Sequence, residues 1–296
     1  MSRPELEDPR TLLHRYDLWP RKSLGQNFLV DATAPDRIAD CADLSAADTV
    51  LEVGAGVGTL TAALAARAGR VLAVETDPKL AAVLQAELGD CEGIEIVHGD
   101  ILELDPADLL GVDVPAAEAT LPLWGPRLAH YRVVSNLPYY ITNAVVQHLL
   151  EAAVRPAQMV LTVQREVALR MVADPGNMSL LAVSVQFYGE PDICMRLGRG
   201  AFYPMPNVDS AVVRVDVYED PPVPVQDVGQ FFQVVKAGFS QRRKQLRNSL
   251  SSTLQLDPNE VEAAMRAYGL DPRRRAEALS IEEWGKTYAA LLPLFR

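Results

Sequence analysis

The sequence predicts an α/β fold: a Rossmann-like domain with a doubly wound parallel sheet, followed by a small all-helical domain. Between residues 48 and 217, short Val-rich runs alternate with longer Ala- and Leu-rich segments, a pattern typical of strands joined by crossover helices. A glycine-rich segment directly follows the first of these runs. After the prolines of residues 221–224, only helical patterns follow.

The elements follow in chain order. Strands are expected at residues 49–53, 71–75, 94–98, 132–135, 159–163 and 208–218. Helices are expected between them at 60–68, 78–88, 143–153 and 166–173. Residues 111–130 contain three prolines and little periodicity, which predicts an extended surface loop. The proline-rich linker then precedes helices expected at 228–239, 242–254, 258–268 and 281–292. The predicted domains are therefore residues 1–220 and 221–296.

Composition limits the classes of protein to which the chain can belong. Its 296 residues are 49% hydrophobic, enough to bury a full core. We expect a cytoplasmic protein without a membrane segment or a metal site, because there is no long apolar run and the three cysteines, Cys41, Cys91 and Cys194, have no paired spacing. The net charge of −11 disfavours a nucleic-acid partner, but residues 226–256 carry five basic residues and one acidic residue. A solvated helix face explains such a run about equally well.

The glycine-rich segment predicts a nucleoside site. Gly54, Gly56 and Gly58 follow the first strand and precede a helix, so the backbone there can turn tightly and approach a ligand. Glu75 ends the second strand twenty-one positions after Gly54, where a carboxylate can accept both hydroxyls of a ribose. This combination fits NAD and S-adenosylmethionine alike, because both contain adenosine.

Two details favour S-adenosylmethionine. The glycines lack the third position of the dinucleotide spacing, and Glu52 precedes them, where it would repel a pyrophosphate but could help to hold an amino group. Asp100 ends the third strand, where it can accept from the adenine amine. Alternatively, Asp100 only caps the turn that follows.

Four spaced motifs now point to one family. Residues 22–29 (KSLGQNFL), 52–56 (EVGAG), 136–139 (NLPY) and 239–244 (FSQRRK) resemble, in this order, the small-subunit rRNA adenine dimethyltransferases of the KsgA type. The resemblance runs from about residue 22 to the last helices. It implies an S-adenosylmethionine-dependent enzyme that adds two methyl groups to the exocyclic N6 of each of two adjacent adenines in the 3′-terminal hairpin of 16S rRNA. It also implies a role in small-subunit biogenesis.

The resemblance extends the cofactor site. By position, the family's cofactor contacts correspond to Asn27, Leu29, Gly54, Glu75, Asp100 and Asn136, and Glu52 and Gly56 belong to the same glycine motif. In such enzymes the segment around residues 20–30 folds over the cofactor, with Asn27 facing its methionine part. We refer to residues 20–30 as the lid segment.

The 136–139 motif predicts the catalytic groups. An adenine amine needs alignment and hydrogen-bond acceptors rather than a strong base in order to attack a sulfonium methyl group. The Asn136 side-chain oxygen and the Leu137 carbonyl can accept its two N–H groups, while Pro138 stiffens the turn. Tyr139 can stack on the ring, and Phe202 matches the family's second aromatic wall, although a core Phe after a turn is the alternative.

The basic segment predicts the RNA contacts, because an extruded base needs its backbone held nearby. The candidates are Lys236, Arg242, Arg243, Lys244 and Arg247. The expected partner is 16S rRNA within a precursor of the small ribosomal subunit, bound by a monomer. Three features depart from the family pattern and weaken the prediction of how the RNA is held: residues 176–181, Met205 and the length of the 111–130 loop.

Three other functions remain open from the sequence. A 23S rRNA adenine methyltransferase of the antibiotic-resistance type shares the Asn-Pro-Tyr pattern, but the 239–244 and 207–214 segments are closer to the small-subunit group. A non-catalytic ribosome assembly factor could keep the fold, although the intact Asn136 and Tyr139 favour an enzyme. An NAD-dependent oxidoreductase would require nicotinamide binding.

Overall fold

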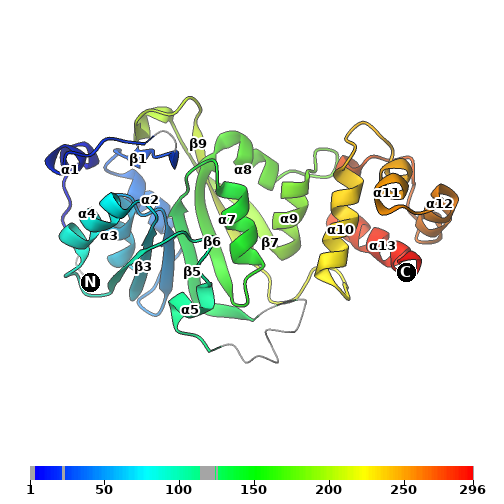
Figure 1. Cartoon of the computed structure of the whole chain (residues 1–296), viewed down its shortest axis with the longest axis horizontal. Coiled ribbons are helices and arrows are strands. Elements are labelled where there is room, and N and C mark those ends of the chain that lie inside the picture. Colours follow the sequence, from blue (N-terminus) through cyan, green and yellow to red (C-terminus); the bar gives the residue numbers. More distant parts are fainter. Residues whose placement is uncertain (1–3, 22–23, 114–123, 125, 296) are drawn as a thin grey trace. The chain divides into compact units, whose positions relative to one another are not determined.

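The computed structural model describes residues 4–21, 24–113, 124 and 126–295, and the chain forms two compact units (Figure 1). The first unit comprises Met1–Val114, Pro126–Ala168 and Pro191–Val217, and the second comprises Pro115–Gly125, Leu169–Glu190 and Tyr218–Arg296. The helical unit therefore includes residues 169–190, which the sequence assigned to the first domain.

The first unit is built around a seven-stranded sheet with the order β4-β3-β2-β5-β6-β9-β7. Its strands are β2 (Thr49–Val53), β3 (Arg70–Glu75), β4 (Ile94–His98), β5 (Arg127–Asn136), β6 (Arg155–Gln164), β7 (Gly189–Leu197) and β9 (Ser210–Val217). Strands β4, β3, β2, β5 and β6 pair in parallel, each with the next in this order, whereas β9 is antiparallel to β6. The chain order reverses between β2 and β5, and open α/β sheets bind ligands at this position.

The central strands β2 and β6 are buried on both faces of the sheet, which explains their continuous apolar runs. Val50 and Leu51 point to opposite faces of β2, and each is at most 1% exposed. One face packs in a core cluster that contains residues of α2 and α3. The strand register pairs Val53 with Val74, and Glu75 with His98, so these strands end at one edge.

The first unit also contains helices, most of which connect its strands. They are α1 (Pro9–Arg15), α2 (Ala34–Asp40), α3 (Thr59–Ala65), α4 (Pro78–Leu88), α5 (Pro106–Leu110), α7 (Thr142–Leu150) and α8 (Arg165–Met171). Asp77 begins α4 by accepting from the Lys79 amide, with Pro78 in the first turn. A separate two-stranded sheet pairs β1 (Phe28–Leu29) antiparallel with β8 (Phe202–Tyr203), just after the 3₁₀ helix η2 (Arg199–Ala201).

The second unit is helical. Its helices are α9 (Leu180–Tyr188), α10 (Val228–Phe239), α11 (Leu246–Leu254), α12 (Pro258–Ala267) and α13 (Ile281–Leu291), with short 3₁₀ helices η3 (Ala276–Ala278) and η4 (Leu292–Leu294). Phe187 of α9 stacks on Phe231 of α10, with ring centroids 4.5 Å apart. The buried Trp284 of α13 lies so close to Gly238 that a Cβ on this glycine would be 2.4 Å from its ring. Aromatic packing therefore determines how closely these helices approach.

Most predicted elements are confirmed, with three corrections. The fourth and fifth strands are longer than predicted, and β5 begins at Arg127, so residues 127–130 belong to a strand rather than a loop. Residues 114–123 and 125 of that loop lie outside the described residues. Helix α11 begins at Leu246 instead of residue 242, because residues 241–244 form a turn. Strands β1, β7 and β8 and helices α1, α2, α5 and α9 were not predicted.

The cysteines are free thiols, but two of them meet. Cys41 follows α2 and Cys194 lies on β7, and their side chains are within hydrogen-bonding distance of each other. This contact with Cys41 lowers the pKa of Cys194 to about 7, and the pKa of Cys41 is raised. Among the described residues, the helices are too short or too polar to cross a bilayer.

Candidate functional site

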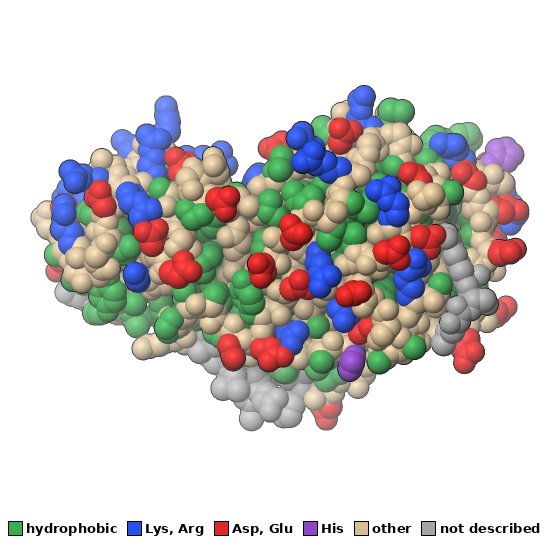
Figure 2. All heavy atoms as spheres, turned by 180° about the vertical axis from the view of Figure 1, so that it is seen from behind, with side chains coloured by type: hydrophobic (Ala, Val, Ile, Leu, Met, Phe, Trp, Pro, Cys, Tyr) green, Lys and Arg blue, Asp and Glu red, His purple; other side chains and the backbone are tan. Residues whose placement is uncertain are grey.

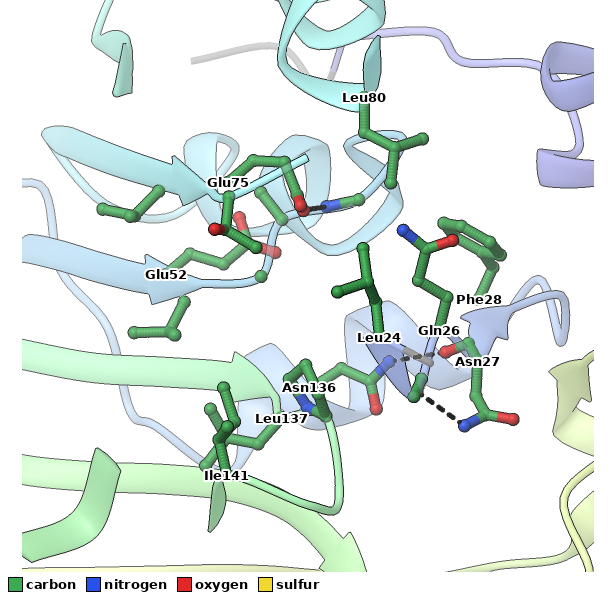
Figure 3. A pocket seen from close by; sticks show the side chains of 18 of the residues that line it. Leu24, Gln26, Asn27, Phe28, Glu52, Glu75, Leu80, Asn136, Leu137 and Ile141 are labelled. Atoms are coloured by element: carbon green, nitrogen blue, oxygen red, sulfur yellow. Dashed lines mark hydrogen bonds between the residues drawn. The ribbon is translucent and has the colours of Figure 1, made fainter. Parts of the chain in front are cut away.

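A pocket opens at the carboxyl edge of the sheet, where β2 and β5 diverge (Figure 3). It is lined by residues 24–29, 52–57, 59–60, 74–76, 80, 99–101 and 136–141. The lid segment, the glycine loop, the ends of three strands and the 136–139 motif therefore all contribute to one cavity. All residues predicted to bind the cofactor line this pocket, and so do Leu137, Pro138 and Tyr139.

The glycine loop is shaped for close approach. Gly54 and Gly56 have φ angles of 71° and 63°, in the left-handed region that favours glycine. A Cβ at Gly54 would be 3.3 Å from the Pro138 ring, and one at Gly56 would be 3.2 Å from Phe28. The loop is therefore packed against both the 136–139 motif and the lid segment, and larger side chains would intrude into the pocket.

Glu75 is held in place by main-chain donors. Its Oε2 accepts from the Gly56 amide at 2.8 Å, and its Oε1 accepts from the Asp77 amide at 2.9 Å. The side chain is 5% exposed, and burial raises its pKa. Each carboxylate oxygen has a second lone pair, so Glu75 can still accept from two hydroxyls of a ligand.

Glu52 lies on the neighbouring strand and is more deeply buried. It is 1% exposed, and Thr61 Oγ1 of α3 donates to its Oε2 at 2.6 Å. Burial raises the pKa of Glu52 to about 8; the Thr61 hydrogen bond opposes this shift, and the nearby Glu75 adds to it. Figure 3 shows the two acidic side chains side by side at the ends of β2 and β3. A positively charged ligand would stabilise the ionised forms of these two buried acids.

Asp100 caps a turn and also lines the pocket. Its Oδ1 accepts from the Leu102 amide at 3.0 Å, so it caps the turn after β4. The same side chain is exposed and lines the pocket. Capping thus fixes the orientation of a carboxylate that is available to the pocket.

The lid segment is bonded to both sides of the pocket. Asn136 Nδ2 donates to the backbone oxygen of Asn27 at 2.9 Å, as the dashed line in Figure 3 shows. Gln26 Nε2 donates to Asp77 Oδ2 at 3.2 Å, and Arg21 forms an ion pair with the same carboxylate at 3.4 Å. The lid segment is therefore fixed to the ends of both β3 and β5.

The 136–139 motif presents acceptors and an aromatic ring. Because Asn136 uses its amide nitrogen on Asn27, its Oδ1 is the atom left to accept from a ligand. The Leu137 amide donates to the Thr162 carbonyl at 3.3 Å, which ties the turn to β6. The Tyr139 hydroxyl lies 2.7 Å from the hydroxyl of Ser210, and the following residue, Tyr140, is 60% exposed.

Phe202 has a different environment from the one suggested by the family resemblance. It lies on β8 opposite Leu29, is 2% exposed, and belongs to the core cluster. It is not among the residues that line the pocket. Its packing supports the lid segment, because β1 and β8 pair directly, and a role as an aromatic wall stays a prediction.

The predicted RNA contacts fall into two groups. Lys236, Arg242, Arg243 and Lys244 are exposed, at the end of α10 and in the turn after it. Arg247, by contrast, bonds to the Pro258 carbonyl and Asn259 and forms an ion pair with Glu262 at 3.2 Å, so it joins α11 to α12. On the face drawn in Figure 2, many Lys and Arg side chains lie on the helical unit, at the left of the view.

Several residues at the site were not found from the sequence. They are the hydrogen-bond partners Thr61, Asp77 and Ser210. Asp77 had a usable signal, because an acidic residue before Pro78 is typical of a helix start. Among the described residues, His, Cys, Asp and Glu form no group of three or more that could hold a metal ion.

The chain is similar to known proteins along nearly its whole length. A model of the family described as "Ribosomal RNA adenine dimethylase" matches residues 19–291. The ribosomal RNA small subunit methyltransferase A of Moorella thermoacetica is 44% identical over 275 residues, which cover 92% of this chain and 93% of that protein. The protein of the same name from Anaeromyxobacter sp. (strain K) is 45% identical over 278 residues, covering 93% and 95%.

Two solved structures share the fold. The 23S rRNA methyltransferase ErmE superposes with a TM-score of 0.67 at 29% identity, covering 90% of this chain and 99% of that one. A dimethyladenosine transferase from Plasmodium falciparum has a TM-score of 0.71 at 20% identity, covering 90% and 98%. The relatives named for the small subunit are thus considerably more similar in sequence than ErmE.

Proposed function

Because the chain belongs to the ribosomal RNA adenine dimethylase family, we propose that it dimethylates two adjacent adenines in the 3′-terminal hairpin of 16S rRNA. The methyl donor in this proposal is S-adenosylmethionine, and the target atom is the exocyclic N6. The observation that carries the proposal is the single pocket that contains the glycine loop, Glu75 and the 136–139 motif. A nucleoside site and an amine-aligning site are thereby adjacent.

The residues of the pocket fit this cofactor. The two left-handed glycines leave room for a ligand at the end of β2, and Glu75 keeps lone pairs for ribose hydroxyls. Asp100 can accept from an adenine amine. Glu52 and Glu75 place two buried acids at the pocket, and a bound cation would favour their ionised forms. When bound, S-adenosylmethionine supplies an electrophilic methyl group on a sulfonium.

Asn136 and Leu137 would align the target amine. The nitrogen lone pair of adenine is delocalised into the ring, and acceptors on its two N–H groups draw the nitrogen towards tetrahedral geometry. Asn136 Oδ1 and the Leu137 carbonyl are the proposed acceptors, with Oδ1 available because Nδ2 is bonded to Asn27. Once one methyl group is on the nitrogen, a single N–H remains, and one acceptor is enough to align it.

Tyr139 would hold the base itself. A ring on the edge of the pocket can stack on an extruded adenine, which contributes roughly 1 to 3 kcal/mol per base. Extrusion is required because the target nitrogen cannot be reached inside a base-paired stack. Tyr139, Asn136 and the lid segment thus bind, orient and enclose the base.

The substrate particle, the cellular location and the oligomeric state are also proposed from the family. The substrate is 16S rRNA within a precursor of the small ribosomal subunit, met in the cytoplasm by a monomer. The exposed Lys236, Arg242, Arg243 and Lys244 would contact the phosphate backbone, which offsets the net charge of −11 locally. Arg247 contributes by fixing the fold of that region, given its ion pair with Glu262.

Parallel methylation of purified precursors of the two ribosomal subunits tests this proposal. Labelled methyl groups from S-adenosylmethionine are expected in the small-subunit RNA, on adjacent adenines and as dimethyladenosine. Labelling confined to the large-subunit RNA would instead support the 23S activity. An unlabelled product with intact RNA binding would support a non-catalytic assembly factor.

A further inference from the structure

One hydrogen bond at the edge of the pocket has no part in the chemistry described so far. The Tyr139 hydroxyl lies 2.7 Å from Ser210 Oγ. Ser210 is fully buried at the start of β9, whereas Tyr139 lies on the turn between β5 and α7 and lines the pocket. A buried hydroxyl thus meets the tip of the ring that is proposed to stack on the target base.

The position of Ser210 is fixed from both sides. On β9 it pairs with Gln164 at the end of β6. The preceding residue, Asp209, accepts from the Arg165 amide through its backbone oxygen at 2.9 Å and from the Arg199 amide through its carboxylate at 3.2 Å. Ser210 is therefore a rigid attachment point, because its backbone belongs to the sheet and the segment before it is bonded to two other elements.

The Ser210 contact restricts the Tyr139 side chain at the end opposite its backbone. The backbone of Tyr139 belongs to a turn, and a tyrosine side chain has two rotatable bonds, χ1 and χ2. Burial raises the pKa of Tyr139, so the phenol stays protonated at neutral pH and can donate to Ser210 Oγ. With the backbone held at one end and the hydroxyl at the other, the direction of the long axis of the ring is fixed, and only rotation about that axis remains.

We propose that Ser210 is a positioning residue, which holds the Tyr139 ring at the edge of the pocket, at the place where it can stack on the extruded adenine. This inference rests on the proposed function and deepens it, because it names the group that prepares the base site before RNA binds. The ring is then ordered when the protein folds, so RNA binding does not carry the entropic cost of ordering it. This is the general advantage of preorganisation. Ser210 itself touches neither substrate nor cofactor.

The test compares Ser210→Ala, Tyr139→Phe and the double variant in the full-length protein, with two 16S-type hairpins. The hairpin with adenine at the target position gives kcat/KM, and the one with 2-aminopurine there, which lacks the N6 amine, gives the fluorescence. The fluorescence of this base rises when it leaves the RNA stack and falls when it stacks on an aromatic ring. Ser210→Ala is expected to weaken the protein-dependent quenching and to lower kcat/KM roughly three- to tenfold, the range for one hydrogen bond. Cofactor affinity is expected to stay within twofold, and Ser210→Thr is expected to restore the quenching.

The double variant separates positioning from general stability. Both single variants remove the same bond, so their effects on kcat/KM should not add. The matched control is Thr287→Val, which removes a buried hydroxyl that donates to the Glu283 carbonyl at 2.7 Å and does not line the pocket; it should leave the quenching unchanged.

Unchanged quenching in Ser210→Ala, or additive losses in the double variant, would overturn the proposal. Equal loss of cofactor affinity would overturn it too, because that would indicate a general structural role. If instead the wild-type protein does not methylate small-subunit RNA, the proposed function fails, whatever the variants do.

Discussion

The most quantitative prediction concerns Glu52, a carboxyl group buried at the end of β2. It is 1% exposed, and burial raises its pKa from the ordinary 4.5 to about 8. In the cofactor-free protein at neutral pH, Glu52 is therefore protonated, whereas in the unfolded chain it is ionised. Glu52→Gln keeps the shape and an oxygen for the Thr61 hydroxyl, but it removes the titration.

The direction in which pH changes the free energy of unfolding follows from proton linkage. Between pH 4.5 and about 8 the folded state binds one proton more than the unfolded state, so raising the pH lowers the free energy of unfolding. The loss is about 1.4 kcal/mol per pH unit, or roughly 3 kcal/mol at pH 7 relative to pH 4.5. Glu52→Gln lacks this loss, and its stability relative to the wild type should rise across the same interval.

Urea unfolding of both proteins without cofactor, at pH 6.0, 6.75 and 7.5, measures this difference. The gap in free energy of unfolding is expected to change by roughly 2 kcal/mol over this interval, in favour of the variant. Glu95→Gln is the matched control: Arg70 lowers the pKa of this exposed carboxylate, so Glu95 is ionised in both states throughout the interval. Parallel curves for Glu52→Gln and wild type would refute the reasoning, because they would mean that Glu52 is ionised in the fold.

Three further predictions follow from the site and its surroundings. Asn136→Ala should lower the methylation rate at least 100-fold, because an acceptor for the reacting amine is lost, while filter binding shows RNA affinity within about twofold. Arg243→Ala should weaken RNA binding and reduce the salt dependence of log K by about one, with cofactor affinity unchanged by calorimetry; an unchanged salt slope would remove it from the RNA interface. At pH 7, iodoacetamide should modify Cys194 faster than Cys91 by mass spectrometry, because the thiol of Cys41 lowers the pKa of Cys194; equal rates would contradict that contact.

The parts of the fold that could be predicted are those where burial leaves a strong pattern. Strands β2 and β4 were predicted residue for residue, because each is a short Val- or Ile-rich run between turn signals. Strand β7 escaped prediction because of its first residues. It begins with Gly189, Glu190, Pro191 and Asp192, and these residue types are depleted in strands.

Helix α9 was missed because it is too uniformly apolar for its periodicity to be recognised. Its residues are apolar on nearly every side, and its Val, Phe and Tyr residues favour strands, so periodicity alone does not identify it. Ser179 was the available signal, since its side chain accepts from the Ala182 amide at the start of the helix.

The candidate site also contains residues that could be predicted from the sequence and residues that could not. The glycine loop and Glu75 were predictable, because their spacing is local and follows from the geometry of a strand, a turn and a helix. The partners Thr61 and Ser210 were not, since each bond joins elements brought together only by the fold. Phe202 illustrates the limit of a family motif, which gives a position in the chain but not how deeply the ring is buried.

The central claim is that the protein uses this pocket to methylate two adjacent adenines of 16S rRNA. Mass spectrometry of 16S rRNA from cells that lack this protein, and from the same cells carrying the wild-type gene or Asn136→Ala, tests it most directly. The account predicts that the two adjacent dimethyladenosines are absent without the protein, return with the wild-type gene and stay absent with Asn136→Ala. Dimethyladenosines that persist in cells lacking the protein, or that return fully with Asn136→Ala, would contradict it.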